Sequence, residues 1–321
     1  MTRRPQRLRG VWWSAATAVL VVSVVLGVSA QRTPAGPDGD PAAVVTPGPV
    51  PALPGRVVDT VGVASYNVQW RTPRARLRAD RDRLTARRGL DLIGWQETNS
   101  SQFRELDARY RARGWETWRW EGPREEGPAA LALSWRTRTF ELLDVDWVHV
   151  DGARRGLAEP HPPRWVVRAR LRHRASGQTF TLLNTHLAHA IEQGEGWRPG
   201  PNARSARKHL RILARLWRST PGDVLLSTGD YNFDHRDDSR ARPAGGISDR
   251  FDGLATSSFA ALGHEHVLPT HTSRWIDYVF VADRSLREGS AGAAQLVDHR
   301  VLEGFHSDHR PLVVRLRLYD R

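Results

Sequence analysis

Short apolar runs, each followed by a polar cluster, recur from residue 61 to the end of the chain. The runs are rich in β-branched residues and bounded by turn residues, which is the pattern of buried strands. Six of these predicted strands are VGVASYN, LDLIGWQE, TFTLLNTH, DVLLSTGDYN, RWIDYVFV and PLVVRLRL. In addition, RWVVRARLRHR and QTFTLLN flank Ala175-Ser176-Gly177, so we expect a hairpin there.

Leucines at helical spacing over residues 74–90 and 202–218 predict two helices between the strands. Asn202 is expected to be the N-cap of the second helix, because its side chain can accept a hydrogen bond from the first turn. Residues 237–248 are expected to form a surface loop. Strands that alternate with helices and include a hairpin predict an α/β protein with mixed sheets.

The N-terminus has the pattern of an export signal. Residues 1–10 carry four arginines and no acidic residue, and residues 11–28 are apolar without a charge. The length of the run favours a transmembrane anchor over residues 11–30, whereas the small residues at its end leave a cleaved signal peptide as the alternative. In both cases residues 1–10 are expected to stay in the cytoplasm, and the rest to lie outside the cell, attached to the cell membrane or secreted.

Residues 31–56 are rich in Pro, Gly and Ala and predict an extended linker. No second stretch of this kind divides the remainder, so residues 57–321 are expected to fold as one domain. We expect the protein to be a monomer.

The composition limits the kinds of partner and of catalytic chemistry that the protein can have. The formal net charge of +13 is compatible with a polyanionic partner such as nucleic acid. Nearly all the positive charge is arginine, however, and Lys208 is the single lysine, which weakens that argument because the bias runs along the whole chain. The chain has no cysteine, which excludes disulfides, thiolate metal sites and a cysteine nucleophile.

Polar residues cluster at or next to the ends of the six predicted strands. If those strands are neighbours in sheets, their ends can meet in one pocket. Carboxylates, imidazoles and amides without sulfur are typical of an oxygen-ligand site for Mg²⁺ or Mn²⁺. The candidate residues are Asn67, Glu97, Asn184, His186, Asp230, Asn232, Asp277, Asp308 and His309.

The motifs SYNVQ, GWQET, LNTHL, GDYN, IDYVF and SDHRP, in that order, resemble those of the endonuclease/exonuclease/phosphatase superfamily, which has the DNase I-like fold. The resemblance covers about residues 60–317. It implies a four-layer α/β sandwich, in which two mixed β-sheets pack face to face with helices outside. It also implies an active site at one edge of the sandwich.

The resemblance implies a metal site built on Glu97, with Asn67 beside it holding metal or phosphate, and with Asp308 as a second carboxylate on the metal side. The expected ion is Mg²⁺, with Mn²⁺ as the alternative. One carboxylate and a substrate phosphate suffice for Mg²⁺, because this ion keeps several of its waters.

The resemblance also assigns catalytic and phosphate-binding roles. His186, Asn184 and Asn232 are expected to bind the substrate phosphate, and Asp230 with Asn232 to orient the attacking water. His309 resembles the general acid/base, and Asp277 the carboxylate that holds its tautomer. An imidazole suits that role because it titrates near neutral pH. Which residue takes the proton from water stays open, as does the number of metal ions.

Together these features predict hydrolysis of a phosphoester by activated water, and we expect an extracellular nuclease acting on nucleic acid. The alternatives are a sphingomyelinase-like phospholipid phosphodiesterase and, from a different class, a surface module that binds nucleic acid without cleaving it. A binding module keeps its ligand when metal is chelated, whereas the enzyme loses turnover.

Tryptophans are numerous in the domain. Trp95 is expected in the core. The group Trp115, Trp118 and Trp120, with Arg119 and Arg124, is a candidate exposed surface for stacking bases or lipid headgroups.

Overall fold

The computed structural model describes residues 50–98, 101–105, 107–152, 162–287 and 292–320. The chain separates into two units, Met1–Val44 and Val45–Arg321, and the described residues all belong to the second. The expected basic segment, the anchor or signal peptide, and the linker as far as residue 49 lie outside the described residues. No helix within the described ranges is long and apolar enough to cross a membrane.

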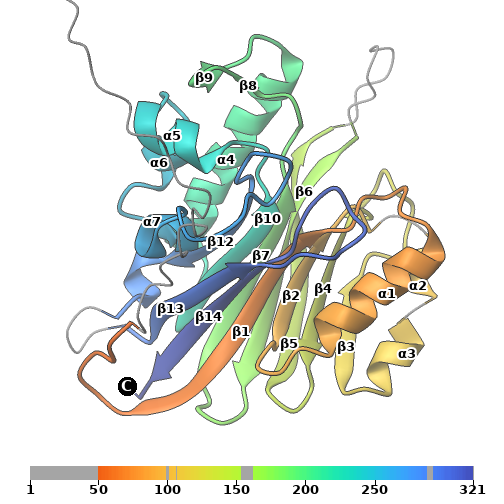
Figure 1. Ribbon diagram of the computed structural model, residues 1–321, viewed down its shortest axis with the longest axis vertical. Coiled ribbons are helices and arrows are strands. Elements are labelled where there is room, and N and C mark those ends of the chain that lie inside the picture. Colours follow the sequence, from red (N-terminus) through yellow and green to blue (C-terminus); the bar gives the residue numbers. More distant parts are fainter. Residues whose placement is uncertain (1–49, 99–100, 106, 153–161, 288–291, 321) are drawn as a thin grey trace, which may run out of the picture. The chain divides into compact units, whose positions relative to one another are not determined.

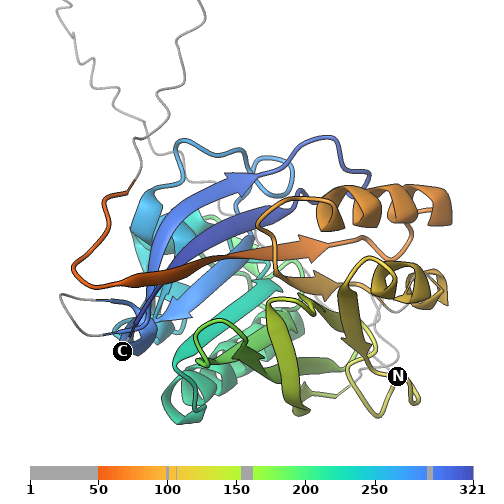
Figure 2. The ribbon, with the colours of Figure 1, turned by 90° about the horizontal axis from the view of Figure 1, so that it is seen from below.

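Two mixed sheets form the centre of the described domain (Figures 1 and 2). The first sheet has the order β13 (Ala294–Val301), β14 (Leu312–Tyr319), β1 (Val57–Asn67), β2 (Leu92–Gln96), β4 (Leu131–Arg136) and β3 (Trp115–Arg119). The second has the order β11 (Ala255–Ser257), β12 (Asp277–Ala282), β10 (Val224–Asp230), β7 (Thr179–His186), β6 (Arg164–His173) and β5 (Phe140–Asp151). A short hairpin, β8 (Glu192–Gln193) and β9 (Gly196–Trp197), stands apart from both.

Strand direction brings polar residues to one edge. Strands β1 and β2 run parallel and pair Asn67 with Gln96, and β7 and β10 run parallel and pair His186 with Asp230. The other neighbours in the two sheets are antiparallel, including the predicted β6–β7 hairpin. All six predicted strands are present, and parallel neighbours end at the same edge of a sheet.

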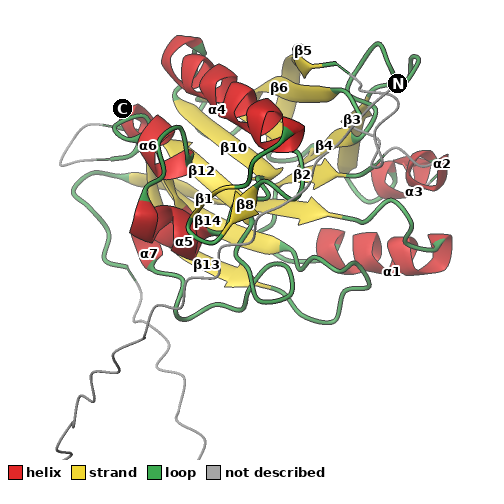
Figure 3. Cartoon of the chain, turned by 90° about the horizontal axis from the view of Figure 1, so that it is seen from above, coloured by secondary structure: helices red, strands yellow, loops and turns green. Residues whose placement is uncertain are grey.

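Helices cover the outer faces of the sheets, as Figure 3 shows for α1 (Arg74–Thr85) on one side and α4 (Pro201–Ser219) on the other. The predicted four-layer α/β sandwich is therefore confirmed. The shorter helices are α2 (Ser101–Arg104), α3 (Asp107–Arg111), α5 (His235–Ala241), α6 (Ile247–Phe251), α7 (Ser258–Leu262) and the 3₁₀ turn η1 (Asp283–Ser285).

Alternating residues of β1 pack on opposite faces of the first sheet. Val61 and Val63 belong to the core between the sheets, while Ala64 and Tyr66 belong to the core beneath α1. Trp95 is fully buried in that second core, as predicted, and its indole N–H donates to Oγ of Ser134 at 2.8 Å. A large buried apolar side chain contributes about 1.5–3 kcal/mol to stability.

Two predictions about the helices need boundary corrections. The helix predicted over residues 74–90 ends at Thr85, and Gly89 has φ 71°, a conformation that no helix accommodates. The other helix begins at Pro201 with Gly200 as its N-cap, so the prediction of Asn202 as N-cap is wrong. Proline suits the first helical position because its missing N–H has no helical partner there.

Residues 237–248 do not form the expected surface loop. They contain most of α5 and the start of α6. The side chain of Asp234 caps α5 by accepting a hydrogen bond from the backbone N–H of Arg236, and buried Asp238 accepts hydrogen bonds from the backbone N–H groups of Ile247 and Ser248. Asp234 and Asp238 therefore order this segment, the first as a helix cap and the second as an acceptor for the start of α6.

Polar contacts join the two sheets close to the edge where the polar strand ends meet. Nδ2 of Asn184 in β7 donates to the backbone oxygens of Trp95 at 2.9 Å and Ala132 at 3.0 Å, across the interface in the first sheet. Its Oδ1 accepts from Nε2 of Gln96 at 2.8 Å and from the hydroxyl of Thr228 at 3.1 Å. Asn184 thus satisfies buried polar groups of both sheets.

Gly94 allows this close approach. A Cβ atom at this position would lie 1.9 Å from Oγ1 of Thr228 and 2.8 Å from Oδ1 of Asn184. Such contacts are far inside van der Waals distance, so a side chain on β2 at this point would push the sheets apart. A second link nearby runs from the backbone N–H of Gly229 to Oγ of Ser65 at 2.9 Å.

Replacing Asn184 with alanine should lower the free energy of unfolding by about 3 kcal/mol or more, because several buried groups would lose partners at about 1–3 kcal/mol each. Urea unfolding followed by circular dichroism measures the change. Asn202→Ala is a matched control: its amide makes an exposed hydrogen bond to the His189 oxygen, and the loss should stay within about 1 kcal/mol. Equal losses in both variants would show that the hydrogen bonds of Asn184 between the sheets contribute no more to stability than one exposed hydrogen bond.

Candidate active site

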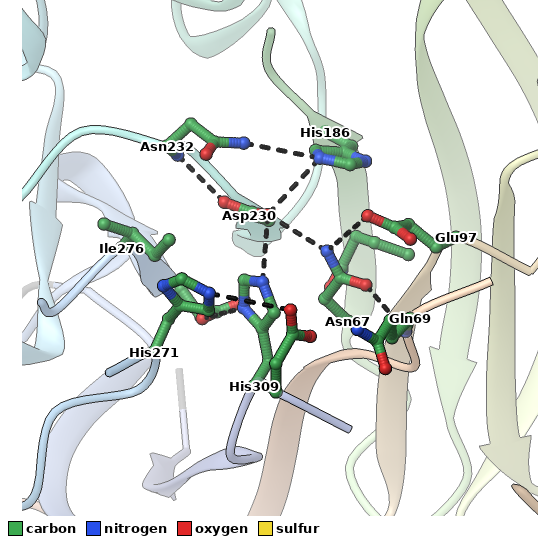
Figure 4. Close-up of polar contacts among 12 residues, drawn as sticks. Asn67, Gln69, Glu97, His186, Asp230, Asn232, His271, Ile276 and His309 are labelled. Carbon is green, nitrogen blue, oxygen red and sulfur yellow. Dashed lines mark hydrogen bonds and ion pairs between the residues drawn. The ribbon is translucent and has the colours of Figure 1, made fainter. Parts of the chain in front are cut away.

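Side chains from both sheets meet at one edge of the sandwich (Figure 4). The first sheet supplies Asn67 at the end of β1 and Glu97 directly after β2, and the second supplies His186 at the end of β7 and Asp230 at the end of β10. Asp277 is the first residue of β12, and His309 lies in the loop before β14.

Asn67 joins carboxylates that come from different sheets. Its Nδ2 donates to Oε1 of Glu97 at 3.1 Å and to Oδ2 of Asp230 at 3.0 Å, while its Oδ1 accepts from the backbone N–H of Gln69 at 3.0 Å. Ionised carboxylates only accept hydrogen bonds, so this network identifies which amide atom is the nitrogen. Asn67 thus positions the two carboxylates through its amide nitrogen. Its Oδ1 accepts one hydrogen bond and has a second lone pair, so its role as a metal or phosphate ligand stays a prediction.

Glu97 and Asn232 are held in backbone conformations that most residues avoid. Their φ angles are 60° and 54°, and Gln69 beside the site has φ 52°. Each such residue costs on the order of 1–3 kcal/mol, which the surrounding structure must offset. For Glu97 that support includes a hydrogen bond from the backbone N–H of Trp70 to Oε2 at 2.9 Å.

Asp230 is buried between two imidazoles. Its Oδ2 lies 3.3 Å from Nε2 of His186 and 3.7 Å from Nε2 of His309, and its Oδ1 accepts from the backbone N–H of Asn232 at 2.9 Å. Burial alone would raise the pKa of Asp230, but the two imidazoles and the hydrogen bond from Asn67 outweigh it and hold the pKa well below its usual range. Asp230 is therefore ionised and ready to accept a proton or a hydrogen bond.

His309 and Asp277 form the predicted pair. Nδ1 of His309 lies 2.8 Å from Oδ2 of Asp277, both residues are buried, and Nε2 of His309 faces Asp230. Burial would lower the pKa of His309, but the charges of Asp277 and Asp230 outweigh it and raise the pKa to about 10. The pair thus fixes the ring's orientation and keeps a proton on Nε2.

The loop before β14 is tied to the end of β1. The Ser307 hydroxyl donates to the backbone oxygen of Asn67 at 2.7 Å and accepts from the backbone N–H of His309 at 3.1 Å. Asp308 points to the surface, with Oδ2 3.7 Å from Nε2 of His271. His271 has no counterpart among the predicted residues, and no sequence signal marks it, because it belongs to none of the six motifs.

Asn184 does not belong to the site. Its side chain is fully buried and occupied by the four inter-sheet hydrogen bonds, so its predicted role in binding phosphate is wrong. His186, two residues further along β7, does reach the site. Asn232 also lies there, with Nδ2 3.4 Å from Nε2 of His186.

Two further residues at the site were not predicted. Arg164, at the start of β6, is buried and donates to the backbone oxygen of His186 at 3.3 Å. Burial lowers the pKa of Arg164 to about 10, opposed by the charges of Asp230 and Glu97, so it remains a cation. Trp70 is 53% exposed, and the Arg71 guanidinium lies 4.7 Å from its ring. Arginine is too frequent in this chain for one position to be informative.

The predicted tryptophan surface is only partly present. Trp115 is buried in the core beneath α1, so its expected exposure is wrong. Trp118 and Trp120 are partly exposed and contact the ring of Trp147, with centroids 6.0 Å and 4.8 Å away. The strand register places them at the same end of the sandwich as the site.

The donor chemistry at Glu97 fits a hard divalent cation. A carboxylate offers about four lone-pair positions, so the hydrogen bonds from Asn67 and Trp70 are compatible with a bound ion. Mg²⁺ can bind through one carboxylate and a substrate phosphate. Among the described residues, Asp308 has ligand atoms within 4.8 Å of those of His271 and His309. Within the described part of the chain, Glu97 belongs to no group of potential metal ligands at this distance. A shared ion at Glu97 and Asp308 stays a prediction.

Solved structures share this architecture. An endonuclease/exonuclease/phosphatase from Bacteroides vulgatus matches at 18% identity with a TM-score of 0.59, covering 81% of this chain and 99% of that one. TDP2 of D. rerio, solved with a single-strand DNA product, matches at 16% identity with a TM-score of 0.58, covering 80% and 99%. A mannosyl-6-phosphatase from Bacteroides thetaiotaomicron matches at 18% identity with a TM-score of 0.54, covering 80% and 99%.

At these identities the likeness establishes the fold, and the predicted DNase I-like fold of the endonuclease/exonuclease/phosphatase proteins is confirmed. No family model matches the sequence, and no curated protein matches it.

In the metal-free protein the His309 ring should titrate far above its ordinary value of 6.5, near 10. Asp277→Asn should lower this pKa, because the largest favourable charge is removed; NMR titration of the imidazole signals measures it. Because folding raises the pKa, the stabilisation by charged His309 is complete below about pH 6.5 and is lost as the pH rises through about 10. Asp298→Asn, whose carboxylate pairs with Arg300, is the control. An unchanged His309 titration in Asp277→Asn would contradict the assigned pair.

Proposed function

We propose that the protein is a divalent-metal-dependent phosphoesterase that hydrolyses phosphodiester or phosphomonoester bonds with water. The observation that carries the proposal is the convergence of ionised Asp230 with the imidazoles of His186 and His309 beside Glu97. Such a site offers acceptors for water, proton donors for phosphoryl oxygens, and a carboxylate for a metal ion. The fold shared with nucleases and phosphatases supports the same reaction class.

In this mechanism the residues of the second sheet handle water and phosphate. Oδ2 of Asp230 accepts a hydrogen bond from the attacking water, and the amide of Asn232 and the ring of His186 donate to phosphoryl oxygens. The transition state of phosphoryl transfer is loose, so water has lost little of its proton and a weak base such as Asp230 suffices. The ring of His309 is protonated and is held by Asp277. Its Nε2 donates a proton to the oxygen on which negative charge develops in the transition state.

A divalent ion held by Glu97 would neutralise charge on the phosphate. Arg164 adds a fixed positive charge behind His186. The metal ion and Arg164 would therefore both supply positive potential around a substrate anion, in addition to the protonated His309.

Substituting His309 or Asp230 should remove most of the activity. His309→Ala and Asp230→Asn should each lower the rate of cleavage of bis(p-nitrophenyl) phosphate by about 10²–10⁴-fold with Mg²⁺ or Mn²⁺, because each removes a proton donor or acceptor. A chelator should abolish turnover by the wild-type protein. His266→Ala, which removes an exposed imidazole outside the site, is the matched control. Turnover that survives both substitutions, or persists with chelator, would refute this mechanism.

For the substrate we propose nucleic acid, with the activity of an extracellular nuclease. Trp70 supports this choice, because an exposed indole whose backbone contacts Glu97 lies where a nucleobase beside the scissile phosphate can stack. The net charge of +13 also favours a polyanionic substrate such as nucleic acid. The extracellular location, with a membrane anchor or a cleaved signal, rests on the N-terminal sequence alone. The phospholipid alternative has weaker support, since only five large apolar side chains are exposed among the described residues.

The role of Trp70 can be tested with an oligonucleotide and its abasic counterpart, which lacks the bases. Trp70→Ala should raise KM for the base-bearing strand by roughly 5–150-fold, corresponding to about 1–3 kcal/mol per stacked base. Trp70→Phe should retain most of the affinity, and the abasic strand should show little difference between variants. An equal effect on both strands would mean that Trp70 acts on the site's geometry and not on a base.

A further inference from the structure

His271 lies against the proposed acid/base pair and has no part in the mechanism described above. Its ring centroid is 4.5 Å from that of His309, and its backbone forms a β-bridge with His309. The reciprocal backbone hydrogen bonds between His271 and Arg274 close a tight turn, which fixes the start of the segment that leads into β12. The backbone at His271 is therefore held in place by two loops that are hydrogen-bonded to each other.

Three donor atoms converge at this point. Nε2 of His271 lies 3.7 Å from Oδ2 of Asp308, and ligand atoms of His271, Asp308 and His309 all lie within 4.8 Å of one another. An ion with bonds of about 2.0–2.1 Å in tetrahedral geometry holds its ligand atoms roughly 3.4 Å apart, so small side-chain rotations bring these atoms onto one ion. His271 and Asp308 are 25% and 46% exposed, which leaves the cluster open to solvent.

In both rings Nδ1 has a hydrogen-bonding neighbour, which leaves Nε2 as the nitrogen for a metal ion. Nδ1 of His309 is held by Asp277 at 2.8 Å, and Nδ1 of His271 lies 3.4 Å from the Thr272 hydroxyl. A carboxylate behind a histidine ligand is the arrangement that fixes the tautomer and strengthens the ring as a metal ligand. The Asp277–His309 pair therefore supplies this support for a metal ion as well as for a proton.

The ligand type selects the ion. Two imidazole nitrogens and one carboxylate favour Zn²⁺ or a neighbouring transition metal, whereas Mg²⁺ prefers oxygen ligands and retained waters. The carboxylate of Glu97 offers oxygen alone. The two positions thus differ in donor chemistry, although both lie at the same edge of the sandwich.

We propose that His271, Asp308 and His309 form a binding site for a Zn²⁺-type transition-metal ion, distinct from the site at Glu97, and that the ion inhibits the enzyme. Binding places the metal ion on Nε2 of His309, so that atom can no longer donate a proton. The inhibition rests on the proposed function, because it acts by removing the acid from the reaction. The binding itself does not depend on it.

Titration calorimetry of the full-length protein with Zn²⁺ tests the site directly. The wild-type protein should bind one ion here, and His271→Ala should weaken that binding at least tenfold, since even the loss of a supporting residue costs roughly 10–100-fold. Glu97→Gln and the surface control His266→Ala should keep the affinity. Substitution with Co²⁺ offers a second measurement, because the visible absorption of a nitrogen-ligated ion should disappear in His271→Ala. Circular dichroism confirms that each variant is folded.

The activity assay then separates the two proposals. Each variant's rate with Mg²⁺ is compared with and without Zn²⁺, and the Zn²⁺ concentration for half inhibition should rise at least tenfold in His271→Ala relative to wild type. Equal Zn²⁺ affinity in wild type and His271→Ala, or binding lost in Glu97→Gln alone, would overturn the site. Zn²⁺ binding that needs His271 in a protein without Mg²⁺-dependent turnover would refute the proposed function and leave the metal site standing.

Discussion

The hydrogen bonds of Asn184 hold the two sheets together at the edge where the candidate site lies. Asn184 forms hydrogen bonds with two backbone oxygens and one side chain of the other sheet. Gly94 leaves room for it, and Ser65 adds a second link to Gly229. Packing of apolar side chains can fill such an interface but does not fix its register, because dispersion and burial have no direction. Directional hydrogen bonds do, since a shift would leave buried polar groups without partners. The position of one sheet's strand ends relative to the other's is therefore set close to the site.

That register matters because neither sheet carries a complete site. Asn67 and Glu97 come from the first sheet, and His186 and Asp230 come from the second. Asn67 donates to a carboxylate from each sheet, which makes it the direct link between Glu97 and Asp230. Asp230 stays ionised although buried, because the two neighbouring imidazoles and the Asn67 amide stabilise its charge. The electrostatic balance exists only when both sheets are assembled.

Much of this fold could be predicted from the sequence, because buried strands of the sandwich are short apolar runs with recognisable ends. The side chains at those ends were also predicted, but how deeply each is buried between the sheets was not. Asn184 and His186 are two residues apart and face the same side of β7, so the alternation of side chains along a strand does not distinguish them. Asn184 nevertheless lies between the sheets, and His186 lies beyond their edge. Asn67 could be placed beside Glu97, but only the hydrogen bonds show which amide atom faces the carboxylates. His271 and Arg164 depend on loop and strand packing that no local pattern records.

The strained backbone at Glu97 and Asn232 follows from the same construction. A strand end that continued in extended geometry would carry the next side chain away from the opposite sheet, because successive residues point to opposite faces. A left-handed residue breaks this alternation and turns the side chain of Glu97 back toward Asn67, where the amide and the Trp70 backbone hold it. The conformational cost of on the order of 1–3 kcal/mol at each position is offset by the packing of the sandwich behind it. Stability of the sheet interface and accuracy of the site are therefore coupled, since a displacement of about 1 Å between reacting groups can cost a hundredfold in rate.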